Sequence, residues 1–181
     1  SLYAATKRSG ELLTQSYSHL FHIPATGLRF FTVYGPWGRP DMAAYLFADA
    51  IREGRPIKVF NNGQMQRDFT YIDDIVSGIL ATLDNPAPED TKGVPHRVFN
   101  LGNNNSENLM DFIGHVEKAM GKEAEKNMMP MQPGDVPATY ADIDTSTKAI
   151  GYKPTTPISV GIPKFIEWYK DYTAGKLKDA A

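Results

Sequence analysis

The first residues that could do chemistry are a tyrosine and a lysine four positions apart, Tyr3 and Lys7, in the segment SLYAATKRSGELL. This segment is rich in helix-forming residues and contains no proline before Pro24, which predicts a helix from about Leu2 to His22. Four residues make about one helical turn, so the phenol and the ammonium would share one helix face. A free phenol has a pKa of about 10, and a neighbouring cation favours the phenolate. The pair could therefore act as a general acid and base.

This spacing is not specific by itself. Tyr172 and Lys176 repeat it near a glycine, and the chain contains 9 tyrosines, so chance pairs are expected. A helix surface without a catalytic role is therefore the alternative interpretation of Tyr3 and Lys7. The other segments of the chain are needed to distinguish a catalytic pair from a plain helix surface.

Composition narrows the class of protein. A chain of 181 residues, with 41% hydrophobic and 22% charged residues, is typical of one globular domain with a substantial core. The net charge of -2 gives no reason to expect a nucleic acid or an anionic membrane as partner, and no apolar run is long enough to span a bilayer. The sequence has no cysteine, which excludes disulfides and thiolate ligands. We therefore expect a cytoplasmic protein, without a metal site.

Strands and helices alternate along the chain, which predicts an α/β fold with a parallel sheet. Two apolar runs, 26–34 and 97–101, have the composition of buried parallel strands. Amphipathic helices are expected after Asp41, Asp73 and Ser106, with these three residues as N-caps. Two buried strands are too few to form a complete sheet, so we expect the chain to be part of a larger α/β protein.

Four segments follow the Tyr3/Lys7 pair in a characteristic order: LRFFTVYGPWGRPDM, QMQRDFTYIDDI, FNLGNNNSENL and QPGDV. Together they resemble the extended short-chain dehydrogenase/reductase family, specifically its NAD-dependent nucleotide-sugar epimerases, and among them most the UDP-glucuronate 4-epimerases. The resemblance covers nearly all of the chain, but only the C-terminal half to two-thirds of such an enzyme. It implies the end of a Rossmann-like parallel sheet followed by a smaller substrate-binding domain.

The resemblance also implies a division of the chain. Residues 1–35 would end the NAD-binding Rossmann domain, residues 36–181 would mainly form the UDP-sugar-binding domain, and residues 72–102 would return to the Rossmann domain. The glycine-rich dinucleotide fingerprint is missing from the sequence, so we expect the cofactor-binding half to precede Ser1. The isolated 181 residues would then be inactive. A non-catalytic, self-associating fragment is the alternative.

By resemblance, the reaction is epimerisation at C4 of UDP-glucuronate to UDP-galacturonate through a 4-keto intermediate. Tyr3 would take the proton of the 4-hydroxyl as hydride leaves for NAD, and Lys7 would bind the nicotinamide ribose. The backbone of Val33, Tyr34 and Gly35 would approach the nicotinamide amide. A homodimer is implied as well. The alternatives are another nucleotide-sugar epimerase, a dehydratase or a decarboxylase of the same fold.

The resemblance assigns further residues to the sugar and the base. Thr32 would meet the sugar, and Arg39 would face the C5 carboxylate, because a guanidinium fork matches a carboxylate bidentately. An exposed loop arginine is the alternative for Arg39. Val59 and Phe60 would frame the uracil, although an apolar pair in a strand is more often part of the core.

The diphosphate and the ribose have their own candidates. Arg67 would hold the diphosphate; the alternative is an ion pair with Asp68 or Asp73. Gln132 stands where related epimerases often carry arginine, which leaves more of the phosphate charge to Arg67. Asp135 would accept hydrogen bonds from the ribose hydroxyls.

Overall fold

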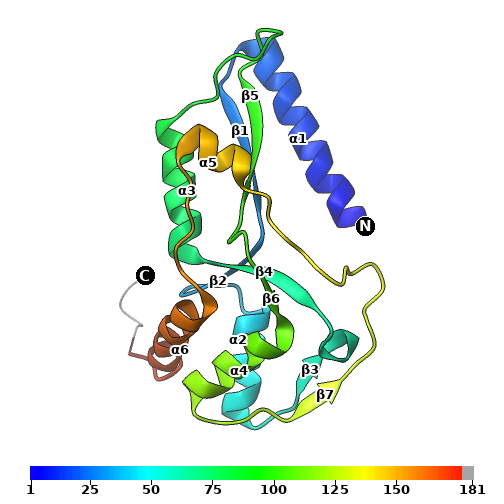
Figure 1. The fold of residues 1–181 in the computed structure, drawn as a ribbon, viewed down its shortest axis with the longest axis vertical. Coiled ribbons are helices and arrows are strands. Elements are labelled where there is room, and N and C mark those ends of the chain that lie inside the picture. Colours follow the sequence, from blue (N-terminus) through cyan, green and yellow to red (C-terminus); the bar gives the residue numbers. More distant parts are fainter. Residues whose placement is uncertain (177–181) are drawn as a thin grey trace.

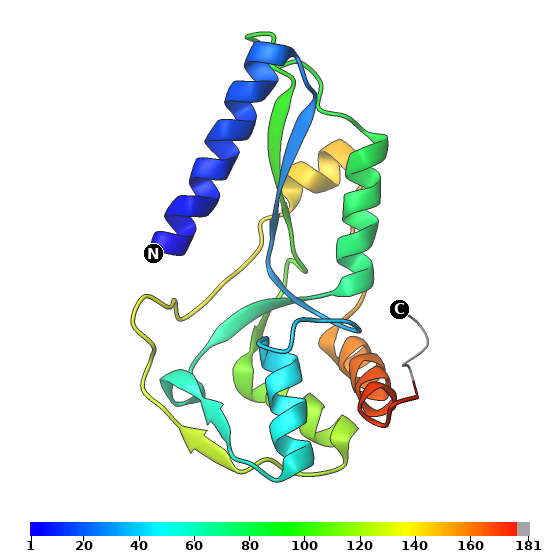
Figure 2. The same cartoon turned by 180° about the vertical axis from the view of Figure 1, so that it is seen from behind.

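The computed structural model describes residues 1–176 and has two regions (Figure 1). In the upper region, a pair of long parallel strands lies between a separate helix on one side and two helices on the other (Figures 1 and 2). Its elements are α1 (Leu2–Phe21), β1 (Ala25–Phe30), α3 (Ile72–Asp84), β5 (His96–Leu101) and α5 (Asp144–Ile150). The predicted first helix is confirmed to within one residue, and it ends where His22 adopts a left-handed conformation with φ of 50°.

The lower region contains the other helices and strands (Figure 1). Its elements are β2 (Thr32–Tyr34), α2 (Ala43–Glu53), β3 (Ile57–Val59), a 3-10 turn (Phe60–Gly63), β4 (Gln66–Tyr71), β6 (Ser106–Asn108), α4 (Leu109–Met120), β7 (Lys126–Met128) and α6 (Ile158–Thr173). The fold class is therefore α/β, as predicted.

Three small sheets connect these elements. Strand β1 pairs in parallel with β5, with Ala25 opposite His96. Strand β2 pairs in parallel with β4, which pairs on its other edge with β6 in antiparallel orientation. Strands β3 and β7 form a third, parallel pair. The predicted parallel pairing is thus present, but it is distributed over three sheets.

The single strand predicted over 26–34 was wrong. The chain divides at Phe31, whose N–H donates to the carbonyl of Leu101 at the end of β5. Beyond this point the chain leaves β5 and pairs with β4 instead. The predicted burial was also wrong for β1, whose residues are half-buried or exposed, because β1 pairs only with β5 and its other edge has no strand partner within residues 1–176.

The three predicted N-caps were also wrong: two of the side chains bond elsewhere, and the third lies inside its helix. Asp41 forms an ion pair with Arg39, and α2 begins two residues later. The hydroxyl of Ser106 donates to the carbonyl of Thr139, and α4 begins at Leu109. Helix α3 begins at Ile72, before the predicted cap, so Asp73 lies within its first turn.

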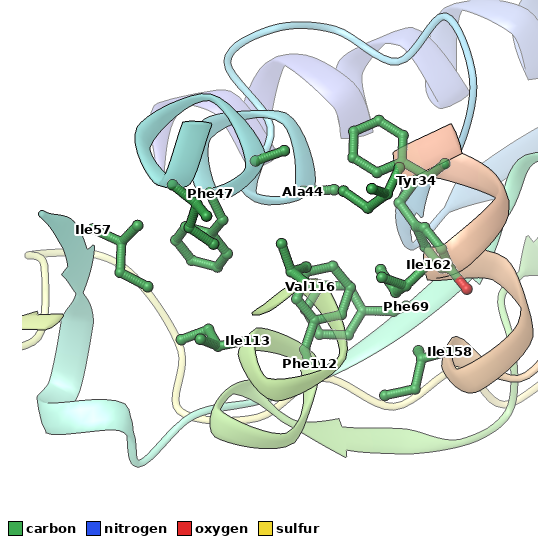
Figure 3. Packing of buried hydrophobic residues seen from close by; sticks show 14 of the residues in the cluster. Tyr34, Ala44, Phe47, Ile57, Phe69, Phe112, Ile113, Val116, Ile158 and Ile162 are labelled. Carbon is green, nitrogen blue, oxygen red and sulfur yellow. The ribbon is translucent and has the colours of Figure 1, made fainter. Parts of the chain in front are cut away.

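The largest core lies in the lower region, among α2, α4, α6 and β4 (Figure 3). The rings of Phe69 and Phe112 stack at a centroid distance of 3.9 Å, and Tyr34 packs edge-on against both. Truncating a buried phenylalanine of this kind costs roughly 3–5 kcal/mol. This core gives residues from distant parts of the sequence a rigid frame.

Two helices of the upper region present apolar side chains to solvent. On α1 the exposed fractions of Leu13 and Leu20 are 63% and 67%, and on α3 those of Leu80 and Leu83 are 54% and 74%. The predicted amphipathic character of α3 is confirmed, but only part of its apolar face is buried within residues 1–176. No helix in this part of the chain is both long and apolar enough to cross a membrane.

Candidate active site

A cavity of about 610 Å³ lies in the lower region, bounded by α2, β3, β4 and the loop that follows β7. Five of the predicted substrate residues line it: Thr32, Phe60, Arg67, Gln132 and Asp135. They come from three separate parts of the sequence, and the fold brings them together.

Arg67 and Asp135 form an ion pair in this cavity, with Nη2 and Oδ1 2.8 Å apart. Arg67 also donates to the carbonyl of Gln66, and Asp135 accepts from the backbone N–H of Val136. The exposed fractions of the two side chains are 15% and 34%, so both are partly shielded from water. A partly buried guanidinium with a single carboxylate partner can still attract an anion.

The ion-pair partners proposed for Arg67 from the sequence were wrong. Successive side chains of a strand point to opposite faces, so Asp68 faces away from the cavity. Its fully buried carboxylate accepts hydrogen bonds from the backbone N–H groups of Asn103 and Ala141 and from the hydroxyl of Thr70. Asp68 therefore ties β4 to the end of β5 and to the segment that follows the loop carrying Asp135.

The two residues predicted to frame the uracil, Val59 and Phe60, lie in different surroundings. Phe60 lines the cavity, whereas the side chain of Val59 is fully buried in the core. The side chain of Val59 is thus not available to frame a base, because the period of β3 directs it inward with Ile57.

Sequence reasoning missed several residues of this cavity. Arg55 and Lys58 line it, and Arg55 is held by Glu53 and Asp49. The alternation of apolar and polar residues in IKV could have predicted that Lys58 points away from the core, on the opposite face of β3 from Ile57 and Val59. Met42 was also missed, because its position depends on where the loop before α2 lies.

A second cavity, also of about 610 Å³, adjoins the first beside β1 and β5. Thr32 and Met42 line both cavities. The remaining lining residues are Arg29, Phe30, Phe31, Asn100 and Thr139. Thr32 therefore stands at the boundary between two spaces, which suits a residue that contacts one part of an extended ligand.

Arg39 lies beside these cavities without lining either of them. Its guanidinium forms a two-pronged pair with Asp41, with distances of 3.0 Å from Nε and 2.8 Å from Nη2. Nη2 also lies 3.9 Å from the sulfur of Met42. The bond to Asp41 raises the pKa of Arg39, and the nearby phenol of Tyr3 acts in the same direction. Arg39 thus stands next to Met42, which lines both cavities.

Tyr3 and Lys7 lie on the same face of α1, as the spacing predicts. The ammonium of Lys7 is 5.3 Å from the centroid of the Tyr3 ring. Tyr3 is 70% exposed, and neither residue lines a cavity formed by residues 1–176. Farther along α1, Glu11 accepts two hydrogen bonds from Arg29 of β1 and one from Arg8, which fixes the helix against the strand.

The segment Val33–Gly35 leads from β2 into a loop. The side chain of Tyr34 is buried in the core, which raises the pKa of its phenol well above the usual value, and its hydroxyl has no hydrogen-bond partner among residues 1–176. Gly35 has φ of 144°, and a Cβ there would lie 2.5 Å from a methyl carbon of Ile72. Glycine is therefore needed for the backbone to pass this close to α3.

Residues 1–176 contain no group of three histidine, aspartate or glutamate side chains that could hold a metal ion. The ionisable groups that line the two cavities are guanidinium, ammonium and carboxylate groups, and the phenol of Tyr3 and the ammonium of Lys7 lie together on α1.

Comparison with known proteins places this geometry in a family. The sequence profile of the NAD dependent epimerase/dehydratase family matches residues 1–102. Protein CapI of Staphylococcus aureus is 50% identical over 95% of this chain and 55% of its own length. UDP-glucuronate 4-epimerase 4 of Arabidopsis thaliana is 46% identical over the whole chain and 44% of its own length. The chain spans about half the length of the curated relatives it matches.

A solved structure is similar as well. The UDP-glucuronic acid 4-epimerase of Bacillus cereus, in complex with UDP-glucuronic acid and NAD, has a TM-score of 0.85 and 39% identity. The similarity covers 95% of this chain and 53% of that one. In sequence and in fold, the chain belongs to the NAD dependent epimerase/dehydratase family.

Proposed function

We propose that this chain is part of a NAD-dependent UDP-glucuronate 4-epimerase, which interconverts UDP-glucuronate and UDP-galacturonate through a 4-keto intermediate. The observation that carries the proposal is the cavity that gathers Thr32, Arg67 and Asp135 beside Arg39. The similarity to the Arabidopsis and Bacillus cereus enzymes supports it.

The nucleotide part of the substrate fits the main cavity. Arg67 would bind the diphosphate, which carries more negative charge than the single carboxylate now paired with it. Asp135 would then accept hydrogen bonds from the ribose hydroxyls, and Phe60 would stack on the uracil, with Gln132 beside them. A cavity of this size is in the range of small-molecule sites in general.

The uronic acid would lie between the two cavities, with Thr32 at its hydroxyls. Arg39 would bind the C5 carboxylate. Because Arg39 already forms a fork with Asp41, the substrate carboxylate would compete with Asp41 for the same donors. A neutral hexose has no group that could do this, so the exchange would favour a uronic acid.

Tyr3 would take the proton of the 4-hydroxyl at its phenol oxygen, and Lys7 would stabilise the phenolate. The ammonium lies close enough to the ring to do so. Bound NAD would supply the oxidant, accepting hydride from C4 and returning it to the opposite face of the ketone.

The residues near β2 fit a nicotinamide. Val33, Tyr34 and Gly35 lie at the carboxyl end of a parallel strand, where ligands of open α/β sheets bind. The absence of a side chain at Gly35 leaves its backbone accessible to a planar amide. Lys7 would bind the nicotinamide ribose from α1.

The two regions of the fold support a division into domains, except that β2 lies in the lower region and α5 in the upper one. Residues 1–35 and 72–102 would belong to the cofactor-binding domain, and the rest of 36–181 mainly to the substrate domain. The exposed apolar residues of α3 support this assignment, because a complete Rossmann sheet and its helices would cover them. The cofactor-binding half would come from residues outside these 181.

Two further properties belong to the same proposal. The exposed apolar face of α1, with Leu13 and Leu20, would contribute to a homodimer. A cytoplasmic location is supported by the sequence, which has no cysteine and therefore needs no oxidising compartment.

Product analysis of the full-length protein tests the proposal. Incubation with UDP-glucuronate and NAD should yield UDP-galacturonate, and UDP-glucose should be converted far more slowly. Arg39→Ala should lose activity selectively on the uronic acid. Equal conversion of both sugars would instead support an epimerase without selectivity for a uronic acid, and unchanged uronate activity in Arg39→Ala would contradict the role assigned to Arg39.

A further inference from the structure

The loop between β2 and α2, residues 35–41, contains an unusual backbone conformation. Trp37 has φ of 61°, in the left-handed region that bulky residues rarely adopt. Such a conformation persists only where the surrounding structure fixes it, and it often marks a functional segment. The question is what holds Trp37 and why.

Two aromatic residues of α6 hold it. The ring of Trp37 lies 5.5 Å from that of Trp168 and 5.8 Å from that of Tyr172, measured between centroids. Trp168 and Tyr172 stack on each other at 5.1 Å, one turn apart on the helix. These three rings, which we call the aromatic clasp, attach the loop to the C-terminal helix.

The start of the same loop is also attached to α6. Tyr34 packs so closely against Gly161 that a Cβ there would lie 2.1 Å from the phenol oxygen. Gly161 and Trp168 are separated by about two helical turns, or ~10 Å. Helix α6 therefore supports the loop at two separate points, although it lies beyond the residues matched by the family profile.

Arg39 depends on this attachment. Its side chain is 73% exposed, and its hydrogen bonds go to Asp41 and Met42, within three residues in sequence. Within the described part of the chain the guanidinium has no hydrogen bond or ion pair to another element, so its position follows the backbone of the loop. The aromatic clasp fixes that backbone two residues before Arg39.

We propose that Trp37 is a positioning residue, which through the aromatic clasp holds Arg39 where it can bind the carboxylate of a uronic acid. This inference rests on the proposed function, because it assigns the origin of selectivity for a uronic acid to α6. The clasp itself touches no reacting atom and does not line either cavity.

Kinetics of the full-length enzyme test this role. In Trp37→Leu the KM for UDP-glucuronate should rise about tenfold, since small misplacements of a binding group are costly. The affinity for UDP alone should not change, because Arg67 and Asp135 are untouched. Trp37→Phe should restore most of the loss. Trp37→Leu combined with Arg39→Ala should be no worse than Arg39→Ala alone, because both changes remove one contact.

A second variant changes a clasp residue that lies on α6. Tyr172 is 44% exposed, so Tyr172→Leu removes a ring without opening the core. It should raise the same KM in the same direction, and it remains informative if Trp37→Leu folds poorly. Val160→Ala, at an exposed position of the same helix outside the clasp, is the matched control and should leave KM unchanged.

Spectroscopy tests the clasp in the 181-residue chain itself. Trp37 and Trp168 are its two tryptophans, and at 5.5 Å their transitions should couple in near-ultraviolet circular dichroism. The coupled signal should disappear in both Trp37→Phe and Trp168→Phe. A wild-type spectrum equal to the sum of the two single-tryptophan spectra would overturn the inference.

The outcomes separate the two proposals. Wild-type turnover of UDP-glucuronate, with an unchanged KM in both Trp37→Leu and Tyr172→Leu, would overturn this inference alone. Additive effects of Trp37→Leu and Arg39→Ala would do the same. Absence of turnover in the full-length wild type would overturn the proposed function, and the role of Trp37 with it.

Discussion

Arg67 of β4 and Asp135 of the loop after β7 are joined at 2.8 Å across 68 positions of sequence. The ion pair sits in the wall of the main cavity and holds together two residues that the proposal assigns to one nucleotide. A bound diphosphate would have to share the Arg67 guanidinium with Asp135 or displace Asp135 from it. The ion pair thus holds both side chains in place before a ligand binds, and it partly neutralises the charge of Arg67.

Binding of UDP to the 181-residue chain tests this arrangement, because Arg67 and Asp135 both lie in this chain and line the same cavity. Arg67→Ala should weaken UDP binding by about 1.5–3 kcal/mol, the usual worth of a hydrogen bond to a charged group. Isothermal titration calorimetry measures it. Arg52→Ala, which removes an exposed arginine outside the cavity, should change the affinity little. Equal losses in both variants would contradict a specific role for Arg67.

The buried carboxylate of Asp68 should matter for stability. Asp68→Ala leaves the N–H groups of Asn103 and Ala141 without their acceptor, which should lower the free energy of unfolding by roughly 2–4 kcal/mol. Asp68→Asn should cost less, because the amide oxygen can keep one acceptor. Urea denaturation measures both variants. The exposed Asp73 provides the control, and Asp73→Asn should stay within about 0.5 kcal/mol of wild type.

The attachment of α1 to β1 should weaken in acid. The bonds from Arg29, and next those from Arg8, lower the pKa of Glu11 from 4.5 to about 2. A carboxyl whose pKa is lower in the folded state stabilises the protein above its unfolded pKa. This contribution is therefore lost as the pH falls from about 4.5 to about 2.

Glu11→Gln tests this by urea denaturation at a series of pH values. The stability difference from wild type should be constant above about pH 5.5 and vanish near pH 2. For Glu167→Gln, on the exposed side of α6, the difference from wild type should not follow this course. A pH-independent difference for Glu11→Gln would show that the ion pair does not hold the helix.

Gly35→Ala should destabilise the turn after β2. The new Cβ would lie 2.5 Å from Ile72, and φ of 144° is unfavourable for alanine, so thermal unfolding should reveal a loss of about 1–3 kcal/mol. Gly114 in α4 has no atom within 4 Å of its would-be Cβ. Gly114→Ala should therefore be neutral or stabilise the helix by up to about 1 kcal/mol. If Gly35→Ala behaved in the same way, the close approach to α3 would not constrain the loop.

Local signals were enough to predict that α1, α2, α3 and α4 are helices, although not the residues at which the last three begin. The composition of α1, the periodicity of α3 and the left-handed Gly121 after α4 all depend on nearby residues, and the structure follows them. The grouping of Thr32, Arg67 and Asp135 was also predicted, although through resemblance rather than through spacing.

Long-range contacts decided the features that the sequence did not reveal. The strand break at Phe31 reflects a choice between β5 and β4 as partners, which no local residue signals. Asp74 illustrates the same limit, because its carboxylate accepts hydrogen bonds from the backbone of Thr155 and Thr156. The pairing of Arg67 with Asp135 likewise follows from tertiary structure.

Turnover of the full-length Tyr3→Phe variant tests the central claim most directly. If Tyr3 takes the proton of the 4-hydroxyl, formation of UDP-galacturonate should fall by about 10²–10⁴-fold. Binding of UDP-glucuronate, which depends on the intact cavity around Arg67, should remain within a few-fold of wild type. Wild-type turnover in Tyr3→Phe would contradict the account.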